Sequence, residues 1–328
     1  MPGPGQVVIE TLFSGISAGT ELTAYRGTNP YLVRRWAPEE RLFLEGGSTS
    51  TLPIDATGYE EVGVVTSTGE GADPGLVGTT IWGDWGHRSQ CVRDAEGAAA
   101  RVMPEGLDFR LGIFAKIGAI ALNAVLDADI HVGETVVVFG AGVPGQIVAQ
   151  LARLNGGRVI VVDPDASRRA LAERMGAYRT IDPLTESVAE LVKSWTDHRG
   201  ADVVVEMSGA YAALQEAVRT VAYSSRVVAS GFYQGEGAAL RLGEEFHHNR
   251  VAIVGSQIYG VAPALQHRWD ELRMTRTVLE LARDGALSLQ ELISHTVPSR
   301  EAPGAFELID AAPSGVLQVV LDYGSSRG

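Results

Sequence analysis

The sequence predicts an α/β fold in which a doubly wound parallel sheet is joined to a second, β-rich unit. After residue 108, the apolar segments TVVVFG, RVIVVD, ADVVVEM, RVVASGF and VAIVGS alternate with helical patterns. Unbroken apolar runs are typical of parallel strands that helices cover on both faces. Before residue 104, short β-type segments are separated by turns rich in Gly and Pro, which is typical of an antiparallel unit.

The β-type segments of the first part are QVVIETLF, GVVTST, GTTIWG, SQCVRD and ARVMP. Between the first two, residues 26–57 show no clear periodicity. We expect an irregular loop there, either a solvated connection or a lid over a substrate.

In the second part, Ile147, Val148, Leu151 and Leu154 recur at helical spacing. The segments SRRALAERMGA, TESVAELVKSW and AALQEAVRTVA are also predicted to be helices. A tail follows, with helix WDELRMTRTVLELARDG, strand ISHTVP, helix PGAFELIDA and strand LQVVLDY. We expect this tail to pack onto the β-rich unit, which gives one domain of residues 1–115 with 259–328 and another of residues 116–258.

The charge balance excludes some partners. With 27 Lys and Arg against 40 Asp and Glu, the net charge is −13, so nucleic acid and anionic membranes are not expected to bind. The single Cys91 allows no intramolecular disulfide, which fits a reducing compartment. Since the N-terminus has no signal-peptide pattern, we expect a cytoplasmic protein.

The strongest motif is FGAGVPGQ, in which Gly140, Gly142 and Gly145 form GxGxxG between a strand and a helix. The first Gly permits a tight turn, the second lets the backbone approach a pyrophosphate, and the third lets the helix pack closely. Val143 and Pro144 begin the helix, whose N-terminus favours phosphate. This predicts a dinucleotide-binding domain of the Rossmann type.

The next strand ends in Asp163, where a carboxylate can bind the ribose hydroxyls and repel a 2′-phosphate. We therefore expect NAD(H) rather than NADP(H), with a strand-end cap as the alternative role. Arg168 either flanks the adenosine or lies at the surface. Ser208, Gly231 and Phe232 follow later strands, at the sheet edge where ligands bind, and are expected to contact the nicotinamide half.

Four segments resemble the medium-chain dehydrogenase/reductase superfamily: SGISAGTEL at 14–22, GYEEVGVV at 58–65, KIGAIAL at 116–122 and VGETVVVFGAGVPG at 132–145. The resemblance extends over nearly the whole chain. It implies a GroES-like catalytic domain beside the Rossmann domain, an oxidoreductase activity, and a homodimer joined through the edge of the nucleotide-domain sheet.

Zinc-dependent members of this superfamily have metal ligands at positions that correspond to Ser17 (or Ala18, since one residue is inserted), Tyr59 and Lys116. A hydroxyl, a phenol and an ammonium do not form a zinc site, which uses thiolate, imidazole or carboxylate. The cysteine-rich structural lobe of the superfamily is missing too. We therefore expect no metal.

The chain more closely resembles a zinc-free branch that includes bacteriochlorophyllide a dehydrogenase. SGISAGTE, GYE and the later Gly231-Phe232-Tyr233 support this resemblance.

The resemblance places Tyr59 and Lys116 beneath the nicotinamide. An ammonium lowers the pKa of a nearby phenol, so Tyr59 is expected to exchange a proton with the substrate oxygen. Glu60 is expected to pair with Lys116 or to shuttle protons to solvent, and Thr20 corresponds to a relay hydroxyl. Ser17 is a candidate that is better explained as a backbone cap. Alternatively, Tyr59 only fills space, and Lys116 and Glu60 form a structural pair.

These observations favour an NAD(H)-dependent, zinc-independent oxidoreductase that transfers hydride between the nicotinamide and a secondary alcohol or ketone of a small molecule. The alternatives are a reductase of C=C or C=N bonds and a non-catalytic nucleotide-binding protein. His87 is expected to be a surface or capping residue.

Overall fold

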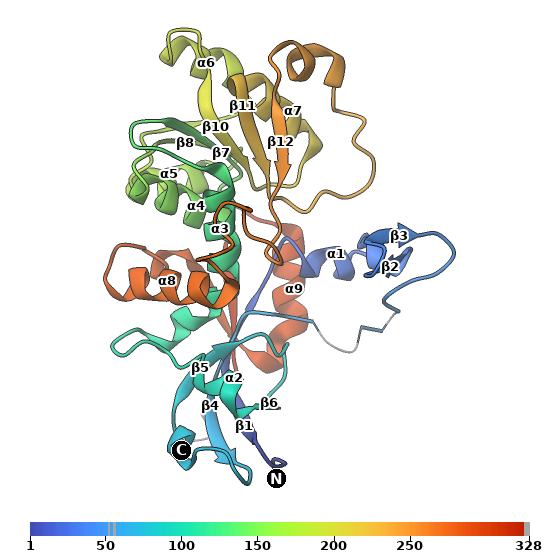
Figure 1. The fold of residues 1–328 in the computed structure, drawn as a ribbon, viewed down its shortest axis with the longest axis vertical. Coiled ribbons are helices and arrows are strands. Elements are labelled where there is room, and N and C mark those ends of the chain that lie inside the picture. Colours follow the sequence, from blue (N-terminus) through green and yellow to red (C-terminus); the bar gives the residue numbers. More distant parts are fainter. Residues whose placement is uncertain (52, 55–56, 325–328) are drawn as a thin grey trace. The chain divides into compact units, whose positions relative to one another are not determined.

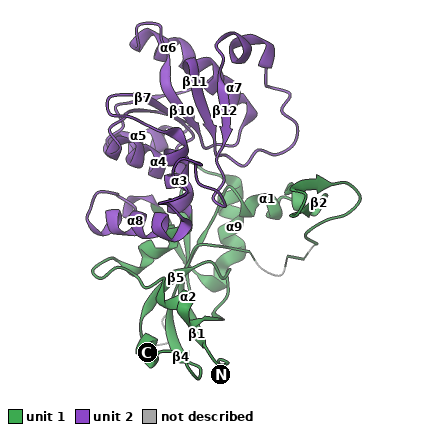
Figure 2. Cartoon of the chain, viewed as in Figure 1, with its two compact units in different colours: residues 1–116, 293–328 green, residues 117–292 purple. Residues whose placement is uncertain are grey.

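The computed structural model describes residues 1–51, 53–54 and 57–324. The chain divides into two compact units, each described by itself. Unit 1 consists of residues 1–116 with 293–328, and unit 2 of residues 117–292 (Figure 2).

Unit 2 contains a six-stranded parallel sheet in the order β12-β11-β10-β7-β8-β9. The predicted doubly wound fold is confirmed. All residues of the central strand β7 are buried, which explains its continuous apolar sequence. The strand order reverses beside β7, where such sheets bind ligands. The strands are β7 (Thr135–Phe139), β8 (Arg158–Val162), β9 (Arg179–Ile181), β10 (Ala201–Glu206), β11 (Val221–Ala229) and β12 (Ala252–Gly255).

Helices connect these strands, as predicted, and cover the sheet (Figure 1). Amphipathic sequences form them; in α4, for example, Ile147, Val148 and Leu151 are buried, although the predicted apolar residue Leu154 is exposed. The helices are α3 (Phe114–Ala128), α4 (Val143–Leu154), α5 (Ala166–Arg174), α6 (Val188–Trp195), α7 (Tyr211–Thr220) and α8 (Glu271–Arg283), and a π-helix covers Leu242–Phe246.

The stretch Phe109–Ala128, which includes α3, is the one helical segment among the described residues that is long and apolar enough to cross a membrane. Of its most apolar window, 72% is buried inside the protein. Such burial is typical of a core helix.

The predicted domain boundary is wrong for residues 259–292, which belong to unit 2. Gly118 of α3 lets α8 approach, because a Cβ at Gly118 would lie 2.5 Å from Cγ1 of Val278. The Ser288 amide donates a hydrogen bond to Oε1 of Gln150 in α4, at 2.7 Å. The amphipathic pattern of α8 predicts an apolar face but does not specify which unit covers that face.

In unit 1, the long strand β1 (Gln6–Ile16) is antiparallel to three strands, β4, β6 and β14. The sheet order is β13-β14-β1-β4-β5, with β6 also paired to β1. The other strands are β4 (Glu61–Thr68), β5 (Thr80–Gly83), β6 (Gln90–Asp94), β13 (Ile293–Pro298) and β14 (Gln318–Asp322). The segment ARVMP is not a strand and forms only an isolated bridge between Ile81 and Val102.

Two short helices of unit 1, α1 (Glu21–Tyr25) and α9 (Ala302–Ala311), are in contact. The rings of Tyr25 and Phe306 lie 5.8 Å apart between them. A third helix, α2 (Ala95–Ala99), follows β6, and 3-10 helices cover Pro30–Leu32, Pro74–Leu76, Phe109–Ile113 and Ser299–Glu301 in unit 1 and Gln290–Leu292 in unit 2.

The segment 26–57 is not wholly irregular, in contrast to the expectation. It contains a hairpin of β2 (Arg35–Ala37) and β3 (Leu42–Leu44). The Phe43 ring packs against Trp36, at 4.9 Å, and Tyr31, at 5.2 Å. Strands of three residues are too short to show a period in the sequence. Positions 52, 55 and 56 of this segment lie outside the described residues.

Candidate functional site

Three hydroxyl groups meet in unit 1, and we call Ser17, Tyr59 and Thr20 the hydroxyl trio. Oγ of Ser17 lies 2.5 Å from Oη of Tyr59, and this phenol also donates to Oγ1 of Thr20 at 3.4 Å. The pairing of β1 with β4 explains the meeting: it places Ser14 opposite Glu61, so the residues after β1 reach those before β4. Ser17 is buried, Tyr59 is partly exposed and Thr20 is exposed.

The carboxylate of Glu21 ties the segments of this site together. Oε1 accepts a hydrogen bond from the Ser17 amide, and Oε2 accepts one from Oγ1 of Thr57, both at 2.8 Å. Oε2 also lies 2.8 Å from Nε2 of His87, whose Nδ1 lies 2.6 Å from Oγ of Ser14. Glu21 therefore holds the Ser17 backbone in place beside Tyr59.

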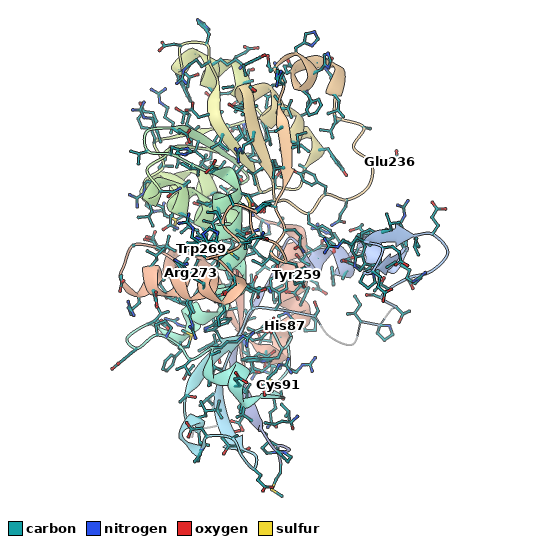
Figure 3. The ribbon with its side chains drawn as sticks, in the orientation of Figure 1. His87, Cys91, Glu236, Tyr259, Trp269 and Arg273 are labelled. Atoms are coloured by element: carbon teal, nitrogen blue, oxygen red, sulfur yellow. The ribbon has the colours of Figure 1, made fainter. Side chains whose placement is uncertain are left out.

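His87, labelled in Figure 3, is neither a surface residue nor a helix cap. Its side chain is only 10% exposed and forms an ion pair with Glu21. Gly58 makes room for it: Gly58 has a φ of +98°, and a Cβ there would lie 2.9 Å from Cε1 of His87. Sequence reasoning missed Glu21 and underestimated His87, because their contact joins positions far apart in the chain.

Two further carboxyl groups are buried beside this network. Burial raises the pKa of Glu60 well above its usual value, with the charges of Glu21 and Glu61 adding to the rise. Burial also raises the pKa of Glu61, to about 7. Burial alone would lower the pKa of His87, but its hydrogen bond to Glu21 and the Glu21 charge raise it overall. Glu60 is 1% exposed, so its own carboxyl group does not reach solvent, and a proton shuttle through it stays a prediction.

The expectation of a lowered pKa for Tyr59 is wrong, because the pKa of Tyr59 is raised. Burial and then the charge of Glu60 raise the pKa of Tyr59, and Glu21 adds to the rise. The hydrogen bonds from Ser17 and Thr20 offset only part of it. Tyr59 is thus a neutral phenol at neutral pH. Lys116 lies in α3 and is partly buried.

The donor atoms at these positions do not fit zinc. Ser17 and Tyr59 offer a hydroxyl and a phenol, which are bonded to each other, whereas zinc sites use thiolate, imidazole and carboxylate. The described part of the chain contains no group of three or more His, Cys, Asp or Glu residues that could hold a metal ion. Cys91 lies buried on β6, where burial raises its pKa to about 11.

The glycine loop in unit 2 has the backbone that its motif predicts. Gly140 has a φ of +89°, which suits only glycine at a tight turn. A Cβ at Gly145 would lie 1.8 Å from the carbonyl oxygen of Gly140, so glycine is needed for α4 to pack there. At Gly142, a Cβ would meet nothing nearer than Cδ of Pro144, at 4.0 Å.

The N-terminus of α4 can therefore accept a phosphate group. Val143 and Pro144 form its first turn, and no described side chain caps it. The N–H groups of a helix first turn and the positive end of the helix dipole favour an anion, and the open space at Gly142 leaves room for a dinucleotide pyrophosphate.

Asp163 follows β8 and is 4% exposed. Its Oδ2 accepts a hydrogen bond from the Ala141 amide at 2.7 Å, and its Oδ1 accepts one from the Asp165 amide at 2.8 Å. Asp163 thus holds the glycine loop, as a strand-end cap would. Arg168 lies in α5, and its carbonyl oxygen accepts a hydrogen bond from Nε2 of Gln146. Sequence reasoning missed Arg169, whose guanidinium donates to the carbonyl oxygen of Asp163 at 2.7 Å.

The remaining predicted cofactor residues come together at the carboxyl ends of β10 and β11. A Cβ at Gly231 would lie 2.2 Å from the Gly209 amide nitrogen, so the loop with Ser208 touches the loop with Gly231 and Phe232. Ser208 and Phe232 are exposed and can meet a ligand.

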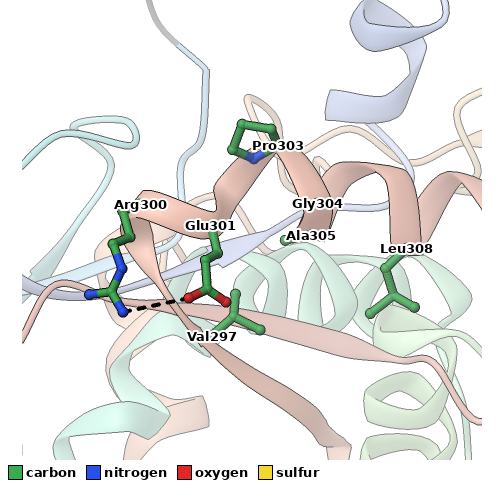
Figure 4. Close-up of a pocket in the computed structure, with 7 residues that line it drawn as sticks. All are labelled: Val297, Arg300, Glu301, Pro303, Gly304, Ala305 and Leu308. Atoms are coloured by element: carbon green, nitrogen blue, oxygen red, sulfur yellow. Dashed lines mark ion pairs between the residues drawn. The ribbon is translucent and has the colours of Figure 1, made fainter.

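A separate cavity of about 470 Å³ lies against β13 and α9 (Figure 4). Its lining includes the ion pair of Arg300 and Glu301, whose charged atoms are 3.6 Å apart. None of the predicted site residues lines it. The lining consists of Val297, Arg300, Glu301, Pro303, Gly304, Ala305 and Leu308.

The chain is similar to dehydrogenases over nearly its whole length. Residues 142–276 match the family model of the zinc-binding dehydrogenases. The chain is 30% identical over 326 residues to D-guloside 3-dehydrogenase of Escherichia coli (strain K12), covering 97% of this chain and 93% of that protein.

Solved structures share the fold. Acetophenone reductase of Geotrichum candidum in complex with NAD has a TM-score of 0.74 at 18% identity, covering 98% of this chain and 91% of that one. A Sinorhizobium meliloti protein bound to NADP has a TM-score of 0.77 at 23% identity, covering 98% and 93%. The predicted fold class and dehydrogenase activity are confirmed at this level, and the chain belongs to the zinc-binding dehydrogenase family of the medium-chain dehydrogenase/reductase superfamily.

Proposed function

We propose that this protein is an NAD(H)-dependent, zinc-independent oxidoreductase that interconverts a secondary alcohol and a ketone on a sugar derivative. The observation on which the proposal depends is the hydroxyl trio, because two of its members, Ser17 and Tyr59, stand at positions that correspond to metal ligands in zinc-dependent relatives. The sugar class is supported by the relative that oxidises position 3 of a guloside.

The nicotinamide ring, when bound, would supply or accept the hydride. The residues of unit 2 would hold the rest of the cofactor: the first turn of α4 the pyrophosphate, and Asp163 the adenosine ribose. The carboxylate of Asp163 supports NAD(H), because its charge would repel the 2′-phosphate of NADP(H).

Tyr59 would act on the substrate oxygen as a neutral acid. In carbonyl reduction its phenol would donate a hydrogen bond, and then its proton, to the developing alkoxide. In alcohol oxidation, a phenol with a raised pKa is a poor base on its own. The proton would then pass through the phenol to another hydroxyl of the trio. The exposed Thr20 gives it a route to solvent, and the buried Ser17 orients the phenol.

Glu21 would be a positioning residue in this scheme. Its carboxylate accepts a hydrogen bond from the Ser17 amide rather than from the phenol of Tyr59. His87 pairs with the same carboxylate and compensates its charge.

Replacement of the phenol tests the mechanism. Tyr59→Phe is expected to lower kcat by about 100-fold, the usual loss when a general acid is removed. Ser17→Ala is expected to lower it less, by about tenfold, because only the orientation of the phenol is lost. Turnover is measured with NAD and NADH on glycosides and their keto forms, with enones and imines as alternative substrates.

Tyr223→Phe is the control, since Tyr223 is 65% exposed, and it should leave kcat unchanged. Full activity of Tyr59→Phe would remove the phenol from the mechanism. Faster turnover of enones or imines than of sugar ketones would favour the double-bond reductase instead.

Cofactor choice is tested at the end of β8. Asp163→Ala is expected to lower kcat/KM for NAD by about tenfold or more, the size of a lost hydrogen bond to a charged group. It is also expected to raise the ratio of kcat/KM for NADP to kcat/KM for NAD. Asp165→Ala is the matched control, because this neighbouring carboxylate caps α5. In Asp165→Ala, the ratio of kcat/KM for NADP to kcat/KM for NAD should equal that of the parent. An unchanged ratio in Asp163→Ala would contradict the assignment.

The buried carboxyl groups predict the pH dependence of stability. A raised pKa means that the folded protein keeps a proton that the unfolded chain loses above its usual pKa near 4.5. The free energy of unfolding therefore falls as the pH rises. The contribution of Glu61 is lost between about pH 4.5 and about pH 7, and that of Glu60 is lost over a range that extends to higher pH. His87 adds in the same direction, since its own raised pKa also favours the protonated folded state.

Glu60→Gln mimics the protonated acid, so the loss of unfolding free energy between pH 5 and pH 8 is expected to be smaller than in the parent. Urea unfolding at both pH values measures it. Glu70→Gln, at an exposed position, should keep the parent dependence. An equal dependence in Glu60→Gln would show that Glu60 is ionised in the folded state.

A further inference from the structure

We propose that Glu206 is a positioning residue that shapes the nicotinamide half of the cofactor site. It would act by fixing the two loops that follow β10 and β11. This inference rests on the proposed function and assigns a role to Tyr233, the last residue of the Gly-Phe-Tyr motif.

Glu206 is the last residue of β10 and has no exposed surface. Its Oε1 accepts hydrogen bonds from the amide of Ser208, at 2.8 Å, and from the hydroxyl of the same residue. Its Oε2 accepts hydrogen bonds from the amide of Gly209, at 3.1 Å, and from the phenol of Tyr233. Four donors from two loops thus converge on one carboxylate.

The backbone of Glu206 joins the same two loops. Its carbonyl oxygen accepts hydrogen bonds from the amides of Ser230, at 2.9 Å, and Gly231, at 3.0 Å. A Cβ at Gly231 would lie 2.9 Å from Oε2 of Glu206. The loops are therefore so close that only glycine fits at their contact.

The charge of Glu206 is compensated by donors, as a buried charge requires. Burial and the charge of Glu206 raise the pKa of Tyr233, so its phenol remains a donor at neutral pH. A glutamine at this position would offer one acceptor oxygen and one NH₂ group. That NH₂ would face one pair of donors and push one loop away.

The position of these loops connects Glu206 to the cofactor. They lie at the carboxyl ends of parallel strands, where such sheets bind ligands. A Cβ at Gly140 of the glycine loop would lie 3.0 Å from the Ser208 amide nitrogen, so the loop after β10 touches the phosphate-binding turn. The adenosine half would depend on Asp163 instead, after β8, on the other side of β7.

Two ligands separate a positioning role from a merely structural one. NADH contains the nicotinamide ring, and ADP-ribose lacks it. Glu206→Gln and Tyr233→Phe are expected to raise the Kd of NADH by about tenfold, the usual effect of a lost charge-assisted hydrogen bond, while the Kd of ADP-ribose stays within about twofold. Titration of NADH fluorescence and calorimetry with ADP-ribose measure the two constants, and the fluorescence enhancement of bound NADH should fall.

Tyr211→Phe is the matched control. Its ring lies 5.2 Å from that of Tyr233, but its phenol donates to the carbonyl oxygen of Gly235 and not to Glu206. This variant should bind both ligands as the parent does. If Glu206→Gln does not fold, Tyr233→Phe, which removes a single hydroxyl, decides the question.

Equal weakening of both ligands in Tyr233→Phe, or no weakening of either, would overturn the inference. A parent protein that binds neither NADH nor ADP-ribose would instead overturn the proposed function. A parent that binds both, with variants that bind NADH equally well, would leave the proposed function standing and remove the role of Glu206.

Discussion

The antiparallel pairing of β1 with β4 is the constraint on which the candidate catalytic site depends. It brings Ser17, just after β1, to Tyr59, just before β4, and their hydroxyl oxygens meet at 2.5 Å. Glu21 then fixes the turn between β1 and α1, because its carboxylate accepts a hydrogen bond from the Ser17 amide. The hydroxyl trio is therefore a product of the sheet register, held by backbone contacts as well as by side chains.

Burial raises the pKa of Tyr59 and of the neighbouring Glu60 and Glu61 more than any single neighbour does. The sequence places a lysine and a tyrosine at positions that relatives use for metal, and the expected consequence is an acidified phenol. The structure reverses the direction, because the phenol is desolvated and the charges of Glu60 and Glu21 also raise its pKa. Tyr59 is thus better suited to donate a hydrogen bond than to remove a proton without help.

The sequence predicts the elements with long, regular patterns well. The parallel strands, α4 and the glycine loop are confirmed, because continuous apolar runs and a GxGxxG turn each have one common structural explanation. The sequence does not predict the hairpin of β2 and β3, because strands of three residues are too short to show an alternating apolar pattern. The sequence also does not predict that α8 belongs to unit 2, because the apolar face of a helix does not show which unit packs against it.

The site residues divide in the same way. Gly140, Gly142 and Gly145 belong to a local motif and are recognised directly. Glu21, His87 and Glu206 matter through contacts with residues that are distant in the chain or buried, and no local pattern distinguishes them from other Glu and His residues. Asp163 shows both aspects: its position at the end of β8 is predicted, while its bond to the Ala141 amide is visible only in the fold.

Metal dependence tests the central claim most directly, namely that hydroxyl groups act where zinc-dependent relatives use a metal. The purified protein is analysed for zinc, and its turnover is measured before and after dialysis against a chelator. The account predicts far less than one zinc per chain and an unchanged kcat after dialysis. One zinc per chain, with turnover lost on dialysis and restored by added Zn²⁺, would contradict it.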